Sequence, residues 1–215
     1  MTADYRLLPL ACASCGAPLA AEGTDLVFYC TACRSGYFFD PAASGGLAPI
    51  AVAFVAAPAA PVARHLPFWL LPARIRILER SASGGSLSSL LGFFLGGKEA
   101  TGSEPGEGTF AIPAFEAPLD RVVNLAERYT QELPVRAAGS GDLLGERLTG
   151  GSCDVADARR LAEFVLIATE VSRGDTVKSF RYELAFGEPR LLGVPFVRRD
   201  EGLVDALFGL PAGRP

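Results

Sequence analysis

Four cysteines near the start of the 215-residue chain have the type and the spacing of metal ligands. They form two Cys-x-x-Cys pairs, Cys12 with Cys15 and Cys30 with Cys33, and residues 16–29 lie between the pairs. Two residues between two thiolates let the chain turn back on itself, so that both sulfurs reach one ion. Zinc prefers four sulfurs at the corners of a tetrahedron, although iron accepts the same set and oxidised cysteines would form disulfides. The spacing therefore predicts a zinc site, and because four thiolates leave no open coordination position, it predicts a structural metal.

The residues around these pairs extend the pattern. Gly16 follows the first pair directly, and the apolar run 26–29 leads into the second pair as a strand would. With these features residues 1–40 resemble the zinc-ribbon family, whose Cys-x-x-Cys-Gly turn is present at the first pair. The second pair has no glycine directly after Cys33, and Gly36 comes only later, so we expect a different turn there. The resemblance implies a structural ion, no reaction, and four ligands: Cys12, Cys15, Cys30 and Cys33.

The composition is that of a folded protein with a sizeable core, because 49% of the residues are hydrophobic and 20% are charged. The formal net charge is −4, so the chain lacks the positive field that non-specific nucleic-acid binding needs. Its start lacks the basic and apolar regions of a signal peptide, and together with the Cys-x-x-Cys pairs this predicts a cytoplasmic location. The longest uncharged apolar stretch, 47–63, contains Pro49, Pro58 and Pro61, which disfavours a membrane span.

A change of composition at Pro41 divides the chain. We expect a zinc ribbon over 1–40 and an α+β body over 41–215, in which a mainly antiparallel sheet carries two helices. Residues 81–108 are rich in glycine and serine and are predicted to form a long surface loop. Apolar patterns place strands at 50–55, 68–80, 109–116, 164–171, 177–186 and 190–198. The segment Gly187-Glu188-Pro189-Arg190 is predicted to be the hairpin turn between the last two strands.

Two segments have the i, i+3/i+4 apolar spacing of amphipathic helices. The first opens at Pro118, since proline is tolerated in the first turn of a helix, and it ends before the next proline. The second begins near Asp154, whose carboxylate is expected to cap the helix. The spacing of Ala158, Leu161 and Ala162 predicts that these three side chains face the core.

Outside the ribbon, Cys153 is the side chain best suited to nucleophilic catalysis. It lies just before the second helix, where the positive end of the helix dipole would lower the pKa of its thiol. A nucleophilic cysteine also needs a base, and the single histidine, His65, precedes a Leu-Pro-Phe-Trp run that is typical of a strand. We expect His65 to face solvent, and the sequence does not place it beside Cys153. The simpler interpretation of Cys153 is a small residue at a helix entry.

Large apolar residues interrupt the glycine- and serine-rich segment. The run Leu87-Ser-Ser-Leu-Leu-Gly-Phe-Phe-Leu95 either packs back as part of the core or docks on a partner. In the second case the partner-binding residues are Leu90, Leu91, Phe93 and Phe94. The sequence thus predicts a non-catalytic zinc-ribbon protein that acts as an interaction or assembly module for a protein partner. The alternatives are a nucleic-acid or transcription-associated binding protein and an enzyme that uses Cys153, while the small-molecule substrate of such an enzyme stays unknown.

Overall fold

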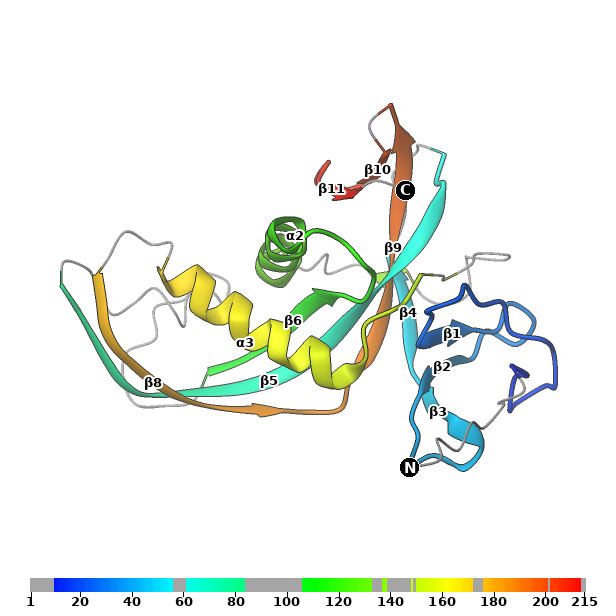
Figure 1. Cartoon of the computed structure of the whole chain (residues 1–215), viewed down its shortest axis with the longest axis horizontal. Helices are drawn as coiled ribbons and strands as arrows, with labels where there is room; N and C mark the ends of the chain where they lie inside the picture. The colour runs from blue at the N-terminus through cyan, green and yellow to red at the C-terminus, as the bar shows by residue number, and fades with distance from the viewer. Residues whose placement is uncertain are drawn as a thin grey trace, which may run out of the picture.

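The computed structural model describes residues 10–55, 61–83, 106–132, 137–138, 148, 150–171, 176–200 and 202–213. A small N-terminal sheet lies beside a larger, mostly antiparallel sheet that carries two helices, which confirms the predicted α+β class (Figure 1). The small sheet packs at one end of the large sheet, and the longest strands of the large sheet extend away from it (Figure 1).

The small sheet has three antiparallel strands in chain order: β1 (Val27–Tyr29), β2 (Gly36–Phe39) and β3 (Leu47–Ile50). A short 3₁₀ turn, η1 (Ser44–Gly46), joins β2 to β3. Gly36 lets the following chain approach closely, because a Cβ atom there would lie 2.1 Å from Val52 Cγ2 and 2.9 Å from the Ile50 carbonyl oxygen. Since β3 lies beyond Pro41, the small sheet extends past the predicted domain boundary.

The large sheet is built around one long strand, β5 (Arg64–Ser83). On one edge β5 pairs with β6 (Gly106–Pro113). On its other edge two strands follow one another: β9 (Arg190–Arg199) pairs with the first part of β5, and β8 (Thr176–Phe186) pairs with the second part. Both are antiparallel to β5, so β8 and β9 run in the same direction, end to end, along a single edge.

The hairpin expected over residues 187–190 is therefore wrong. The chain does not turn back after β8, and the Gly187 N–H donates to the Pro72 carbonyl at 2.8 Å, between the two paired segments. The physical reason is the length of β5, which offers enough open edge for both strands. Pro189 has no N–H to donate, so the interruption between the strands falls where the pairing would be weakest.

Four shorter strands complete the large sheet: β4 (Val52–Val55), β7 (Ala137–Ala138), β10 (Gly202–Asp205) and β11 (Pro211–Gly213). β4 runs parallel to β9 and pairs on its other side with β7. β10 pairs with β9, and β11 pairs with β10. The strand expected over 50–55 is thus split at Ala51, with its first residue in the small sheet and the rest in the large one.

Both predicted helices form: α3 lies over the long strands, and α2 packs mainly against β6 (Figure 1). α2 (Leu119–Gln131) begins directly after Pro118, as expected. α3 (Val155–Val171) is preceded by Asp154, whose Oδ1 accepts a hydrogen bond from the Asp157 N–H at 2.7 Å. This bond confirms the predicted cap, because it satisfies one of the free N–H groups at the start of a helix.

α3 continues further than expected and includes residues 164–171, so the strand predicted there is wrong. Ala158 and Ala162 are fully buried, and Val165 and Leu166 continue the same buried face. That spacing of three to four residues suits a helix packed on a sheet. By composition the apolar run after residue 163 fits a strand equally well. The packing of the preceding helical turns against the sheet favours continuation of the helix.

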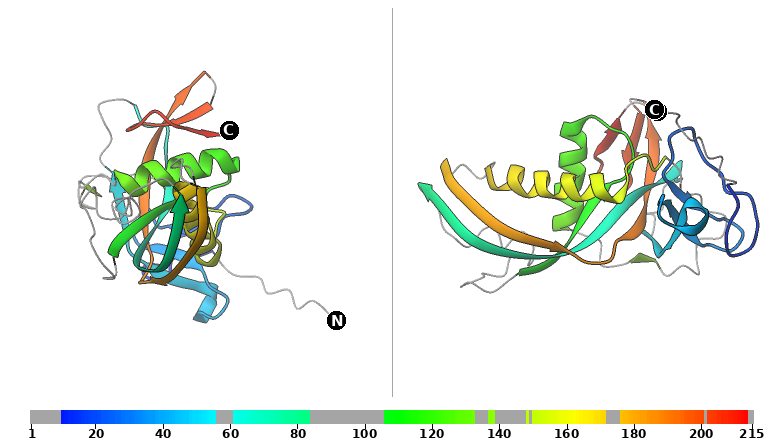
Figure 2. Two further views of the ribbon diagram at one scale, coloured as in Figure 1. Left: turned by 90° about the vertical axis from the view of Figure 1, so that its left-hand side faces the viewer. Right: turned by 60° about the horizontal axis from the view of Figure 1, so that its bottom comes forward.

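The first half of β5 is buried on both faces. Trp69 and Leu71 belong to one core cluster, which includes the buried face of α3. Phe68 and Leu70 point the opposite way and belong to a second cluster, which includes residues of α2 and of β9. Further along, β5 and β8 curve together beyond this doubly covered region (Figure 2).

The small sheet shares a core with the body. Val27 and Tyr29 of β1 belong to the same buried cluster as Trp69, and the Tyr29 ring meets the Phe54 ring edge-on at 5.3 Å between centroids. Gly151 closes this junction, since a Cβ atom there would lie 2.5 Å from Val27 Cβ. The Gly151 carbonyl also accepts a hydrogen bond from the Val27 N–H at 3.2 Å.

The structure tests only the ends of the predicted loop over 81–108. β5 continues through Ser83 and β6 begins at Gly106, so both ends are strand. The predicted partner-binding residues lie outside the described residues, and their role stays a prediction: Leu90, Leu91, Phe93 and Phe94. Within the described ranges, no helix is both long enough and apolar enough to cross a membrane.

Candidate metal centre

The four cysteines predicted as ligands meet at one place. The Sγ atoms of Cys12, Cys15, Cys30 and Cys33 all lie within 4.8 Å of one another. Cys12 Sγ is 3.4 Å from Cys33 Sγ, and Cys15 Sγ is 3.6 Å from Cys30 Sγ, so each of these contacts joins one pair to the other. All four are free cysteines, and these separations exceed the length of about 2.05 Å of a disulfide bond.

These sulfur–sulfur distances fit a tetrahedral metal site. Four sulfurs bonded at about 2.3 Å to one central ion lie about 3.8 Å apart. Cys12 and Cys30 are buried, whereas Cys15 and Cys33 are exposed, so one side of the cluster faces the protein and the other faces solvent. The donor set and its size are compatible with one metal ion.

The first Cys-x-x-Cys turn is held by two backbone hydrogen bonds. The Gly16 N–H donates to the Cys12 carbonyl at 2.8 Å, and the Cys12 N–H donates to the Ala17 carbonyl at 2.8 Å. Gly16 has a φ of 75°, in the left-handed region that glycine enters without steric cost. The glycine of the motif is therefore used as the sequence predicts.

The second turn repeats the first without a glycine. The Arg34 N–H donates to the Cys30 carbonyl at 2.7 Å, and the Cys30 N–H donates to the Ser35 carbonyl at 2.9 Å. Arg34 takes a φ of 65° and is the one non-glycine residue with positive φ in the described part of the chain. The expectation of a different turn is wrong, because Arg34 adopts the left-handed conformation itself. Gly36 instead allows β3 to lie close to β2.

Three hydroxyl groups surround the cysteines, and sequence reasoning did not identify them. The Tyr37 hydroxyl lies 3.3 Å from Cys12 Sγ and 2.7 Å from Ser14 Oγ. Ser35 Oγ lies 3.3 Å from Cys33 Sγ and 3.4 Å from Ser14 Oγ. Groups that hydrogen-bond to ligands orient them around a metal. The signal in the sequence is local, since each serine stands inside or beside a Cys-x-x-Cys pair and Tyr37 lies on β2.

The cysteines of the cluster differ in their pKa values. Burial raises the pKa of Cys12, but the Tyr37 hydroxyl and the N–H groups of Cys15 and Ser14 outweigh it and lower that pKa to about 6. The Ala17 N–H favours the Cys15 thiolate, yet hydrogen bonds with the other thiols raise the pKa of Cys15 to about 12. Neighbouring thiolates repel, so they cannot all ionise together unless a cation replaces the protons.

Cys153 lies in an environment that disfavours its thiolate. Burial, with the carboxylates of Asp157 and Asp154, raises the pKa of Cys153 to about 12. Its Sγ contacts the Asp154 carbonyl oxygen at 3.5 Å, and its own carbonyl accepts a hydrogen bond from Trp69 Nε1 at 2.9 Å. The expectation that the helix dipole lowers the pKa of this thiol is wrong, because desolvation and two acidic neighbours oppose it. Cys153 packs at the entry of α3.

His65 is also placed differently from the expectation. It is fully buried, and its ring meets the Phe54 ring edge-on at 5.3 Å between centroids. β5 is covered at this position by β9 on one edge and by the core on both faces. The prediction that His65 faces solvent is wrong because it assumed a half-exposed strand. The first half of β5 is instead buried on both faces.

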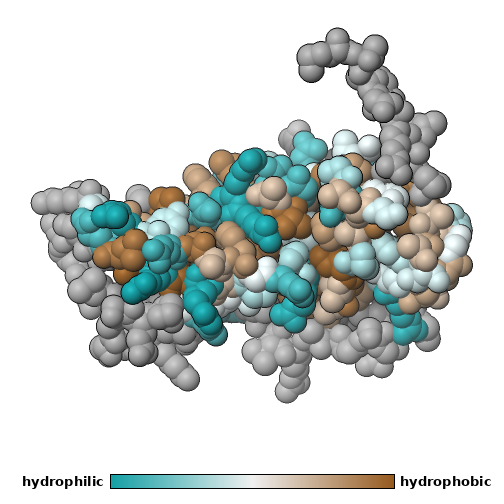
Figure 3. All heavy atoms as spheres, turned by 90° about the horizontal axis from the view of Figure 1, so that it is seen from below, coloured by the Kyte–Doolittle hydropathy of each residue, from teal (hydrophilic) through white to brown (hydrophobic). Residues whose placement is uncertain are grey.

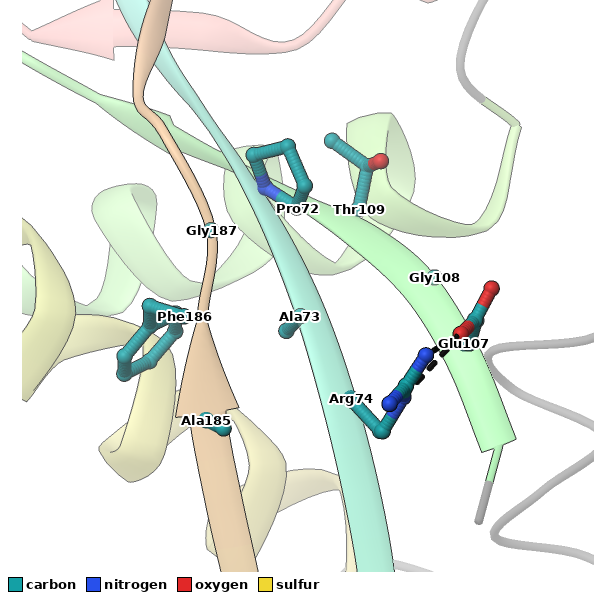
Figure 4. A pocket seen from close by; sticks show the side chains of 9 residues that line it. All are labelled: Pro72, Ala73, Arg74, Glu107, Gly108, Thr109, Ala185, Phe186 and Gly187. Atoms are coloured by element: carbon teal, nitrogen blue, oxygen red, sulfur yellow. Dashed lines mark hydrogen bonds and ion pairs between the residues drawn. The ribbon is translucent and has the colours of Figure 1, made fainter.

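An open hollow of about 590 Å³ lies on the sheet face that points away from α3, beside the break between β8 and β9 (Figure 4). Main chain and small side chains line most of it, including Thr109 and Gly187. Arg74 and Glu107 stand at one end and pair with each other, with Arg74 Nε 3.0 Å from Glu107 Oε1. Because its charged groups neutralise each other, the hollow offers a ligand no unpaired charge, and we assign it none.

Further along the same sheet face, arginines alternate with carboxylates. Arg76 pairs with Glu183 at 3.9 Å, and Arg181 pairs with Glu79 at 3.8 Å. Figure 3 views the molecule from this side and shows hydrophilic side chains spread among hydrophobic ones. Nucleic-acid binding requires a contiguous positive face, and the described part of this face is electrically mixed. It gives the nucleic-acid alternative no support.

Comparisons of the chain with protein-family models, with curated proteins and with solved structures found no match.

Proposed function

We propose that Cys12, Cys15, Cys30 and Cys33 bind one zinc ion, and that the ion has a structural role in a non-catalytic interaction module. The observation that carries the metal proposal is the cluster of four sulfurs within 4.8 Å, held by two matching turns. Zinc suits it best because the donors are all thiolates and the sulfur–sulfur distances of 3.4 and 3.6 Å suit a tetrahedron. When bound, zinc would supply the positive charge that lets all four thiols ionise.

The site is suited to holding structure and not to catalysis. Four protein ligands fill a tetrahedral zinc ion and leave no position for water or substrate. The small sheet has little core of its own, and its central cluster consists of two of the cysteines with Leu19, Phe28 and Tyr37. A unit of this size depends on its metal for folding.

The metal site also supports the body through β1. Val27 and Tyr29 reach from the small sheet into the cluster of Trp69 and Phe54. A zinc ion that fixes the two turns would hold β1 and β2 in place, and β1 in turn would cover this part of the core. Loss of the metal should therefore destabilise the body as well as the small sheet.

An interaction role is the function that best suits the remaining surface. Phe164 and Ile167 lie one turn apart on α3 and are 46% and 43% exposed. Leu119 at the start of α2 is 54% exposed. Adjacent exposed apolar side chains are typical of surfaces that bind other proteins. Together with a hollow that has no free charge, they favour a protein partner over a small-molecule substrate.

Metal analysis of purified protein tests the zinc proposal. We expect one zinc per chain in the wild type, loss of zinc in Cys30→Ser, and full zinc in the matched control Cys153→Ser, whose thiol lies outside the cluster. Iron in place of zinc, no metal in the wild type, or full zinc in Cys30→Ser would contradict the proposal. Circular dichroism of each variant shows whether the fold is retained.

A further inference from the structure

β8 (Thr176–Phe186) lies at a rim of the large sheet. β5 pairs with one side of β8, and no strand among the described residues pairs with its other side. The left view of Figure 2 shows β6, β5 and β8 side by side, with β8 at the margin. A strand in this position directs the N–H and C=O groups of alternate residues outward, where another strand can pair with them.

The side chains of β8 divide cleanly between the two faces of the sheet. Phe180, Tyr182 and Leu184 face the helix side and are only half-buried, and the rings of Phe180 and Tyr182 lie 5.0 Å apart. Arg181 and Glu183 are exposed on the opposite face. The rim therefore carries apolar surface that α3 covers incompletely, together with one positive and one negative charge.

This pattern is complementary to itself. If two β8 strands pair antiparallel with Tyr182 opposite Tyr182, then Arg181 of each copy lies opposite Glu183 of the other. In the same register Phe180 lies opposite Leu184, so apolar side chains meet on the helix side. Directly opposed residues in antiparallel strands interact, and opposite charges there are favourable whereas like charges are unfavourable.

The existing ion pairs extend this complementarity across both copies. Within one chain Arg76 already pairs with Glu183 at 3.9 Å, and Arg181 with Glu79 at 3.8 Å. In the symmetric register a row of side chains would run from Arg76 to Glu183, then to Arg181 and Glu79 of the second copy. Charges alternate in sign along this row and along its symmetry mate. A one-residue shift of the register would put the charged side chains on the apolar face.

We infer that β8 pairs antiparallel with β8 of a second copy of this chain, so that the two large sheets join into one continuous sheet. A two-fold axis perpendicular to the sheet relates the copies and places both α3 helices on the same side. The inference names a partner for the proposed assembly role and does not involve the metal site. Because the contact is one strand wide, we expect an interface below the standard size and an affinity in the micromolar range.

Sedimentation velocity over a range of protein concentrations tests the inference with two charge reversals. Arg181→Glu opposes two carboxylates across the rim, and Glu183→Arg opposes two guanidinium groups, so each variant alone should dimerise at least about tenfold more weakly than the wild type. An equal mixture of the two variants restores opposite charges at both contacts. The mixture should therefore associate about as strongly as the wild type.

Arg74→Glu is the matched control. It changes the net charge by the same amount as Arg181→Glu and breaks an ion pair on the same face, that with Glu107, but it lies on β5 away from the rim. We expect its self-association to equal that of the wild type. Zinc content is measured on every sample, so that a failure of the dimer and a failure of the proposed metal site are told apart.

Three results would overturn the inference. One is a wild type that stays monomeric at the highest concentration. Such a result contradicts the inference even if hydrogen exchange shows that another segment of the same chain protects the outer amides of β8. Another is self-association that neither charge reversal weakens. The third is a mixture of the two variants that associates no better than each alone. Unchanged thermal denaturation of both variants excludes misfolding as the cause of a weakened dimer.

Discussion

Arg34 occupies in the second Cys-x-x-Cys turn the position that Gly16 occupies in the first, and both backbones are left-handed, with φ of 65° and 75°. The hydrogen bonds of the two turns match as well. A residue with a Cβ atom is disfavoured in this conformation by about 1–2 kcal/mol, whereas glycine is not. The second turn is thus formed at a cost that the first turn avoids. A metal ion bound by the four cysteines, as proposed, would offset this cost.

We predict that Arg34→Gly stabilises the protein. Removal of the left-handed strain is partly cancelled by the greater freedom of glycine in the unfolded chain, so the free energy of unfolding should rise by about 0.5–1 kcal/mol. Arg34→Ala keeps the Cβ atom and removes the charge, so it serves as the control and should bring no such gain. Urea denaturation of the metal-loaded variants measures the difference, and equal stability of the glycine and alanine variants would contradict the explanation.

The cluster of four cysteines was predictable because its signal is local. The spacing within each pair is enough to bring two sulfurs to one ion, and no distant contact is needed to recognise it. The left-handed conformation of Arg34 was not predictable, since arginine has no preference for positive φ. The role of the Tyr37 hydroxyl was missed because it depends on a non-local contact. The pairing of β2 with β1 brings this hydroxyl to Cys12 Sγ.

Predictions for the body failed where distant contacts decide the structure. Gly187-Glu188-Pro189 has the composition of a turn, yet the open edge of β5 lets the chain run straight on from β8 into β9. The apolar run at 164–171 suits a strand, yet Ala158 and Ala162 have already set a helical face against the sheet. His65 is buried because the first half of β5 is central, and alternation along one strand does not reveal what covers it.

The junction between the two sheets should tolerate no side chain at Gly151. A Cβ atom there would lie 2.5 Å from Val27 Cβ, so Gly151→Ala must displace β1 from the core. Overpacking of this kind costs about 1–3 kcal/mol, and we expect a loss of that size in the free energy of unfolding. Gly23→Ala is the control, because its Cβ would meet no atom within 4 Å. Equal stability of the two variants in urea denaturation would contradict a shared core.

A buried hydrogen bond joins α2 to β10. The Tyr129 hydroxyl donates to Asp205 Oδ1 at 2.8 Å, and the same oxygen accepts the N–H of Phe208 at 2.8 Å. Burial, and secondarily the Asp205 carboxylate, raises the pKa of Tyr129 well above its usual value. The folded protein therefore holds this proton more tightly than the unfolded chain does.

The sign of the resulting pH dependence follows from this difference. The contribution of Tyr129 to stability is complete below about pH 10, the ordinary pKa of tyrosine, and is lost as the pH rises above that value. We expect Tyr129→Phe to lower the free energy of unfolding at pH 7 by about 1–3 kcal/mol, because Asp205 loses a buried donor. The variant should also lose less stability than the wild type between pH 9 and pH 11. Parallel curves for the two proteins in urea denaturation would contradict this account.

X-ray absorption at the zinc edge of the purified wild-type protein tests whether the four cysteines hold a zinc ion. The technique reports the metal, the type of its ligands and their distances in solution. We expect one zinc ion surrounded by four sulfurs at about 2.3 Å, supplied by Cys12, Cys15, Cys30 and Cys33. A zinc shell that contains nitrogen or oxygen ligands, or a protein that carries no zinc at this site, would contradict it.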